Sequence, residues 1–230
     1  MATPTISVIV PCYSYGQYLK EALQSLADQT VLPDEIIIVS DGAIDNSVEI
    51  AKDFKLGNPQ LDIRIIEKKN GGLASARNAG VIESRSEYVF SFDSDDILRP
   101  DTIKVYKELA EPNTVVTLPL MAFGSENYTA RPEIGSLEIF RKRNCIYSNS
   151  LFPVKLWRLV GGFDESEVMR LGLEDWLFWG ECAKVGAKFK TGDYVSLLWR
   201  RHPKSMSASS ANPNWGKITK YIYEKLNRPA

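Results

Sequence analysis

The sequence predicts an α/β protein whose mostly parallel, twisted sheet is covered by helices on both faces. Strand-like and helix-like segments alternate four times between Ile6 and Phe92. The strand-like segments are apolar throughout, as in parallel strands that are buried on both sides. Three of these segments are followed by polar or glycine-rich turns, and ligands of open α/β sheets bind at the carboxyl ends of the strands. Those turns are therefore where a site is expected.

The first half of the chain contains the clearest elements. Pro11 ends an apolar run, and the next segment has Leu19, Leu23 and Leu26 at helical spacing. Later, residues 45–47 (Asp-Asn-Ser) are typical of the start of a helix. We expect strands at 6–10, 35–39, 61–66 and 88–92, and helices at 16–29, 45–54 and 73–84.

The second half has a weaker pattern. We expect a helix at 102–109, a strand at 114–118, a turn at 161–165, a helix at 173–184 and strands at 189–190 and 195–199. Residues 121–144 show no clear period and predict a loop or a short hairpin over the site. With no internal repeat, residues 1–230 are interpreted as one domain, with a nucleotide-donor half (about 1–110), an acceptor half (about 111–204) and a partly mobile tail (about 205–230).

The composition of the chain limits which partners it can bind and in which cellular compartment it is expected. With 230 residues, 44% of them hydrophobic, the chain is long enough for a full core, and its net charge of −1 gives no argument for binding nucleic acid. Three widely spaced cysteines match neither a disulfide framework nor a zinc site. No signal peptide or membrane span is apparent. We expect a cytoplasmic protein, and peripheral association with the inner face of the membrane is compatible with this sequence.

Three carboxylates follow the strand that ends near Phe92. The stretch Y-V-F-S-F-D-S-D-D passes from apolar residues directly to Asp93, Asp95 and Asp96. Crowded carboxylates stay ionised only beside a cation, and oxygen ligands of this kind suit Mg²⁺ or Mn²⁺. A turn that caps the helix near Pro100 is the simpler explanation of an isolated D-x-D. Asp41 and the Gly71–Gly72 turn are predicted at the same edge of the sheet, which favours a site.

Six motifs together resemble the inverting family-2 glycosyltransferases, which have the GT-A fold. They are V-I-V-P-C-Y at 8–13, E-I-I-I-V-S-D-G at 35–42, G-G-L-A-S-A-R-N-A-G at 71–80, D-S-D-D at 93–96, G-G-F-D-E at 161–165 and L-E-D-W at 173–176. Each motif alone is weak, but all six occur in the order that the family has. The chain departs from the family pattern at Ser40 and at Ala43–Ile44.

The resemblance assigns most of the donor site. It implies that Asp41 accepts the ring N–H of a uracil-like base and that Asp93 contacts the ribose, with Pro11, Tyr13, Arg77 and Ser94 as further donor-binding residues. Asp96 either orients the donor sugar or supports the following helix. Asp95 is the implied ligand of Mn²⁺ or Mg²⁺, with His202 beside it, and Arg200, Arg201 and Lys204 close over the diphosphate. From the residues alone, Asp41 as a turn cap and Arg77 as a surface side chain remain open alternatives.

The resemblance also assigns the catalytic base. It implies that Asp175 removes the proton of the acceptor hydroxyl, with Glu174 as the alternative base or an acceptor ligand. Two acids at a helix start also favour that helix through its dipole, which is the purely structural explanation. Trp176 and Trp179, three residues apart, are interpreted as a core stripe.

The sequence therefore predicts a metal-dependent inverting glycosyltransferase. It would move a sugar from a UDP- or dTDP-sugar, or less favourably a GDP-sugar, to a hydroxyl of a glycan or glycolipid in the assembly of cell-surface polysaccharide or glycoprotein glycans. Two alternatives are a sugar-nucleotide-binding regulatory module and a sugar nucleotidyltransferase. A nucleotidyltransferase has a Gly-rich basic loop after its first strand, and this sequence lacks such a loop. A binding module would have no use for Asp175.

Overall fold

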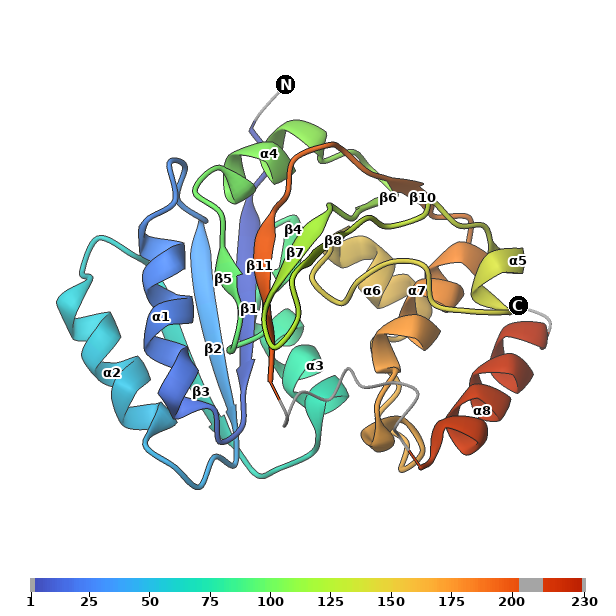
Figure 1. Ribbon diagram of the computed structural model, residues 1–230, viewed down its shortest axis with the longest axis horizontal. Coiled ribbons are helices and arrows are strands. Elements are labelled where there is room, and N and C mark those ends of the chain that lie inside the picture. The colour runs from blue at the N-terminus through green and yellow to red at the C-terminus, as the bar shows by residue number, and fades with distance from the viewer. Residues whose placement is uncertain (1–2, 203–212, 229–230) are drawn as a thin grey trace.

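The computed structural model describes residues 3–202 and 213–228 and contains a large, mostly parallel sheet with helices on both faces (Figure 1). The strands of this sheet lie in the order β10-β6-β9-β4-β1-β2-β3. Their bounds are β1 (Ile6–Cys12), β2 (Glu35–Asp41), β3 (Ile63–Lys68), β4 (Tyr88–Ser91), β6 (Thr114–Val116), β9 (Leu151–Pro153) and β10 (Lys188–Lys190). The predicted α/β class is confirmed.

One strand of the main sheet runs against its neighbours. β4, β1, β2 and β3 are mutually parallel, and so are β6 and β10, whereas β9 is antiparallel to both β4 and β6. The sequence pattern did not predict β9, because Leu151–Pro153 is too short for a period to be visible. β9 joins the two halves of the sheet into one.

The helices cover the two faces of this sheet. Their bounds are α1 (Gly16–Ala27), α2 (Ser47–Gly57), α3 (Leu73–Glu83), α4 (Thr102–Leu109), α5 (Leu137–Phe140), α6 (Val154–Val160), α7 (Glu174–Lys184) and α8 (Trp215–Asn227), with a 3₁₀ turn η1 (Met169–Leu171). Alternate residues of one strand serve different cores: Val8 and Val10 pack with α1, α2 and α4, and Ile9 packs with α3, α6, α7 and α8. This explains why β1 has apolar residues on both of its faces.

A second, smaller sheet lies in front of the main sheet in Figure 1 and has the order β5-β11-β7-β8. Its strands are β5 (Ile97–Leu98), β7 (Leu120–Gly124), β8 (Tyr128–Ala130) and β11 (Leu197–Arg201). β7 and β8 form an antiparallel hairpin, which is one of the two structures predicted for residues 121–144. β11 ends next to His202 and so brings that residue to the loop after β4.

The C-terminal part contains a helix that the sequence analysis did not predict. Residues 203–212, with Lys204 and the start of the predicted tail, lie outside the described residues. α8 follows, and its Ile218, Ile222 and Leu226 are buried against the α7 side of the molecule. Within 3–202 and 213–228, none of the helices combines the length and apolar character needed to cross a membrane.

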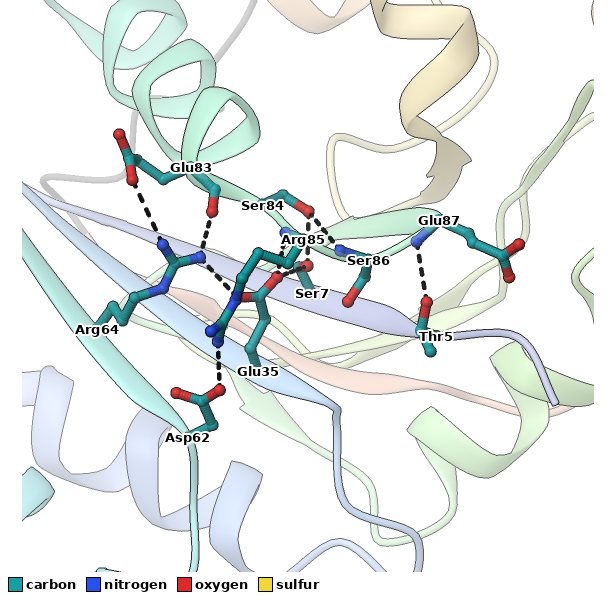
Figure 2. A network of polar contacts seen from close by, with 10 residues as sticks. All are labelled: Thr5, Ser7, Glu35, Asp62, Arg64, Glu83, Ser84, Arg85, Ser86 and Glu87. Carbon is teal, nitrogen blue, oxygen red and sulfur yellow. Dashed lines mark hydrogen bonds and ion pairs between the residues drawn. The ribbon is translucent and has the colours of Figure 1, made fainter.

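A buried carboxylate anchors the amino-terminal ends of the central strands, at the edge opposite the predicted site (Figure 2). Glu35, which is 2% exposed, accepts hydrogen bonds from Ser7 Oγ, Arg64 Nη2, and both the backbone N and Nε of Arg85. Burial pushes the pKa of Glu35 upward, but these hydrogen bonds outweigh it and lower the pKa below its ordinary value of 4.5. The network ties β1, β2 and β3 to the loop that precedes β4.

We expect Glu35→Gln to lower the free energy of unfolding by about 2 kcal/mol at pH 7, because the charge-assisted hydrogen bonds weaken while their partners stay in place. A carboxylate with a lowered folded pKa contributes stability above its unfolded pKa and loses that contribution as the pH falls through the folded value. The difference between the variant and the unaltered protein should therefore shrink below pH 4.5.

Urea unfolding between pH 7 and pH 3 measures this difference in the free energy of unfolding. Glu67→Gln, at an exposed ion pair with Lys52, is the control and should change little. A difference that is constant across this range would contradict the role given to Glu35.

Candidate functional site

A cavity of about 780 Å³ lies at the carboxyl ends of the central strands and is walled by residues from both halves of the chain. Nine of the residues predicted for the site line it: Pro11, Tyr13, Asp41, Arg77, Asp93, Ser94, Asp95, Glu174 and Asp175. Asp96 and His202 are adjacent to lining residues without being part of the lining. Residues that lie 134 positions apart, such as Asp41 and Asp175, thus face one space.

Asp41 is fixed by the glycine turn that follows β3. Its carboxylate accepts from the backbone N of Gly71 at 2.9 Å and of Gly72 at 2.8 Å, and from Lys68 Nζ at 2.8 Å. Gly72 has φ of +90°, and a side chain at Gly71 would come within 2.6 Å of Ser75 Oγ, so glycine is required for this turn. The turn-capping alternative is therefore realised. Because a carboxylate has about four lone-pair sites, Asp41 can still accept from a ligand in the cavity.

Arg77 is buried between the donor side and the α7 side of the cavity. It is 2% exposed, and its guanidinium donates to Ser91 Oγ at 3.0 Å, to Asp93 Oδ1 at 3.0 Å and to Glu174 Oε1. This excludes the alternative of a surface arginine. One cation therefore holds a carboxylate from the end of β4 and another from the start of α7.

Asp95 and His202 converge at the end of the cavity near α1. His202 Nε2 lies 3.1 Å from Asp95 Oδ2, and the imidazole packs against the rings of Tyr15 and Tyr18, with centroids 5.7 and 5.1 Å away. Burial and the nearby Asp93 raise the pKa of Asp95, whereas the hydrogen bond with His202 lowers it. A carboxylate oxygen and an imidazole nitrogen are both ligand types that divalent cations accept, and here they lie side by side.

The residues present fit a divalent cation that is shared with a diphosphate. Among the residues that the structure describes, no group of three or more His, Cys, Asp and Glu side chains is arranged to hold a metal ion. Mg²⁺ and similar cations are usually held by one or two protein ligands, with the rest from substrate phosphates and water. Asp95 and His202 would supply that smaller number of ligands.

Asp96 points into the protein. It is 1% exposed, and it accepts from Asn149 Nδ2 at 3.0 Å and from the backbone N of Arg200 at 2.9 Å. Arg200 Nε in turn donates to the carbonyl of Asp95 at 2.8 Å, and its guanidinium lies over the ring of Tyr18. These contacts tie Asp96 to Asn149 and to β11, and neither of them is with the following helix α4. Arg200, which was predicted to close over the diphosphate, fixes the loop that carries Asp95 in this structure.

The two acids at the start of α7 have different surroundings. Glu174 is 3% exposed and is paired with Arg77, whereas Asp175 is half-buried and accepts from Asn144 Nδ2 at 3.0 Å. Burial, followed by the charge of Glu174, raises the pKa of Asp175 to about 7, although Arg77 and the hydrogen bonds from the Trp176 backbone and Asn144 act in the opposite direction. Asp175 therefore combines access to the cavity with a pKa suited to proton transfer at neutral pH.

Several site residues were not found from the sequence. Asn144, Ser148 and Asn149 contact Asp175, Asp93 and Asp96 respectively, and all three lie in a segment without secondary structure or period. Polar residues in such a segment give no local signal of what they touch. The core interpretation of Trp176 and Trp179, in contrast, agrees with their exposures of 4% and 0%.

Comparison with known proteins identifies a family and related folds. The sequence model of the family described as Glycosyl transferase family 2 matches residues 7–163. The chain is 31% identical over 175 residues to the chondroitin synthase of Pasteurella multocida (strain Pm70), a match that covers 70% of this chain and 17% of that protein. The chain thus spans about a sixth of the length of this relative.

Solved structures with the same fold have lower sequence identity. The structure of S. aureus TarS 1–349 in complex with UDP-GlcNAc is similar over 98% of this chain and 68% of that one, with a TM-score of 0.78 and 20% identity. The mannosyltransferase PcManGT from Pyrobaculum calidifontis, in complex with GDP-Man and Mn²⁺, covers 98% of this chain and 74% of that one, with a TM-score of 0.70 and 16% identity. At these identities the likeness concerns the fold.

Proposed function

This chain belongs to glycosyl transferase family 2 and has its GT-A fold, and we propose that it transfers a sugar, with inversion, from a nucleotide diphosphate sugar to a hydroxyl of a glycan or glycolipid. The observation that carries the proposal is that one cavity joins Asp95, beside His202, to Asp175 at the start of α7. A sugar-nucleotide-binding module needs the first of these features and has no use for a proton acceptor at the second. The cavity therefore favours an enzyme over a binding module.

The donor half of the cavity matches a nucleoside diphosphate. We assign the nucleobase to Asp41, whose fixed carboxylate accepts an N–H of uracil or thymine. We assign the ribose to Asp93, which Arg77 and Ser148 hold in place. Pro11, Tyr13 and Ser94 complete the wall beside them. Arg77 then acts on the donor through Asp93. A UDP- or dTDP-sugar is the favoured donor, because a carboxylate left facing cytosine would meet no N–H at this position.

The phosphates belong at Asp95 and His202, together with Mn²⁺ or Mg²⁺. When bound, such a cation neutralises the negative charge that builds on the departing nucleoside diphosphate. The chain's contribution is to hold the two ligands 3.1 Å apart through Arg200, Tyr15 and Tyr18. That arrangement is preorganised, since Arg200, Tyr15 and Tyr18 are half-buried and already contact Asp95 or His202.

Transfer is a single displacement in this proposal. The acceptor hydroxyl oxygen forms its bond to the anomeric carbon while the bond from that carbon to the diphosphate oxygen breaks. The hydroxyl proton passes to Asp175, which Asn144 holds in position. Since attack occurs on the face opposite the leaving group, the product has the opposite anomeric configuration.

The relatives support a role in polysaccharide synthesis, because one of them is a chondroitin synthase. We extend this to the assembly of cell-surface polysaccharide or of glycoprotein glycans. Cys12, Cys145 and Cys182 are free thiols, which supports a reducing, cytoplasmic location for the reaction. An acceptor carried on a lipid would bring the chain to the inner face of the membrane.

The donor and metal assignments are tested together by thermal unfolding with UDP, dTDP, GDP or CDP, each with Mn²⁺ or with EDTA. Ligand stabilisation at 100 times its dissociation constant is about 2.7 kcal/mol, which moves the melting temperature measurably. We expect UDP and dTDP to raise the melting temperature more than CDP, and to do so more strongly with Mn²⁺ than with EDTA. Asp95→Asn should abolish the Mn²⁺-dependent part.

Glu21→Gln is the matched control. It alters an exposed acid of α1 that pairs with Arg200 of β11 but does not line the cavity, so its Mn²⁺-dependent shift should persist. If UDP raises the melting temperature equally in Mn²⁺ and in EDTA, the assignment of a metal ion to Asp95 is wrong. If UDP and CDP raise the melting temperature equally, the assignment of Asp41 as the residue that recognises the nucleobase is wrong.

A further inference from the structure

The first residue of α8 is an aromatic side chain in the wall of the cavity. Trp215 is 36% exposed and lines the same cavity as Asp175. Its ring centroid lies 6.1 Å from that of Trp176, the residue that follows Asp175 in α7, with the ring planes tilted by 40°. Trp176 itself is buried and donates from Nε1 to the carbonyl of Phe140 at 2.6 Å. Trp215 thus lies against a fixed ring and leaves part of its own surface open.

The helix that presents Trp215 is firmly attached. α8 packs beside α7, as Figure 1 shows, with Ile218, Ile222 and Leu226 in the core. Leu226 lies so close to Gly180 that a Cβ there would be 2.5 Å from Leu226 Cδ1. Tyr221 Oη also donates to Asp164 Oδ2 at 2.9 Å. Because the helix is anchored along its length, the position of Trp215 is fixed by the fold.

The position of Trp215 in the cavity separates it from the nucleotide. Asp41 ends β2, and Asp93 and Asp95 follow β4, whereas Trp215 and Asp175 belong to the α7–α8 side. The nucleotide phosphates need charged or polar partners, and an indole face offers none. A pyranose ring, in contrast, has an apolar face of C–H groups and a rim of hydroxyls, and such an amphipathic ring packs well on an aromatic surface.

We propose that Trp215 is the platform for a sugar ring of the acceptor, so that the acceptor is a glycan whose ring packs on the indole while its nucleophilic hydroxyl lies at Asp175. The inference rests on the proposed function and adds the acceptor subsite to it. Asn144, which lines the cavity and holds Asp175, sets the position of the hydroxyl relative to the platform.

Glycan binding tests this assignment. The probe is a printed array of defined tetrasaccharides of hexoses, N-acetylhexosamines and hexuronates, including those of chondroitin, read with the labelled full chain. We expect Trp215→Ala to raise the apparent Kd for the glycans bound by the unaltered chain by about tenfold, because a stacked aromatic contact is lost. Trp215→Phe should recover most of the binding. Tyr223→Ala is the control, since Tyr223 is exposed on the same helix but does not line the cavity.

Donor binding is read separately, from the melting-temperature shift with UDP and Mn²⁺, and should be the same in all four proteins. Unchanged glycan binding in Trp215→Ala would overturn the platform, as would an unaltered chain that binds no glycan on the array. Equal losses in Trp215→Ala and Tyr223→Ala would assign the effect to the helix and not to the ring. A missing UDP shift in the unaltered protein would instead count against the proposed function, so the two failures are distinguishable.

Discussion

Asp175→Asn should lower the rate of sugar transfer by ~10²–10⁴-fold while donor affinity stays within a few-fold of the unaltered protein. Asn keeps the shape of the side chain and can still hydrogen-bond, but it cannot take the proton of the acceptor hydroxyl. Asp175 lines the cavity and is held by Asn144 Nδ2 at 3.0 Å, so the change removes a group whose position is already set. The rate is measured as release of nucleoside diphosphate, with water as the acceptor until a glycan is identified.

The control is the neighbouring acid. Glu174→Gln leaves the proton acceptor in place, and we expect its effect on the rate to be much smaller than that of Asp175→Asn, because Glu174 is buried on Arg77. With a matched acceptor, the product should have the opposite anomeric configuration to the donor. Full activity in Asp175→Asn would contradict the assignment of Asp175 as the catalytic base. A product with the same anomeric configuration as the donor would exclude the single displacement.

The pH dependence has a defined direction. Burial, together with the charge of Glu174, raises the pKa of Asp175 to about 7. Only the deprotonated carboxylate can accept a proton, so the rate should rise with pH through about 7 and then level off. Below that pH it should fall by about tenfold per unit, and Asp175→Asn should flatten the profile. A rate that is independent of pH between 5 and 8 would contradict the assignment of Asp175 as base.

The sequence predicted those parts of the fold that have a clear local pattern of apolar residues. The strand ending at Cys12 is apolar at all but one position because its two faces pack into different cores, and that property is visible without the structure. The helix over Thr102–Leu109 was predicted with its observed bounds. β9 and α8 were not, since Leu151–Pro153 is too short for a period and α8 follows a polar, Ser- and Asn-rich segment.

The same limit applies to the site. Carboxylates at strand ends, such as Asp41 and Asp95, could be located because parallel strands end at one edge of the sheet. Contacts between segments far apart in the sequence could not: Asn144 holds Asp175 from 31 residues away, and Trp215 reaches the cavity from the helix that was not predicted. Arg77 was assigned to the donor by resemblance, and its pairing with Glu174, 97 residues later, became visible only in three dimensions.

That pairing leads to the largest expected effect on stability. Arg77→Met should lower the free energy of unfolding by about 3–5 kcal/mol, because it leaves the carboxylate of Glu174 buried without its cation. Arg77 is 2% exposed and Glu174 3%, so neither group can reach water without local unfolding. Asp93, with 29% of its side chain exposed, can be rehydrated and adds less to the cost. Urea unfolding measures the difference, with Lys52→Met, at an exposed ion pair, as the control that should change it by less than about 1 kcal/mol.

The double variant Arg77→Met, Glu174→Met separates charge from packing. Replacing both members of a buried ion pair with apolar side chains is often neutral or stabilising, so we expect the double variant to recover most of the stability that the single variant loses. It should not recover the transfer rate. Without Arg77, Asp93 loses the donor that holds it for the ribose, and Asp175 loses a cation that lowers its pKa as well as the Glu174 charge that raises it. Recovery of both stability and rate would mean that Arg77 only fills space between α3 and α7, and recovery of neither would mean that the ion pair is not what Arg77→Met disrupts.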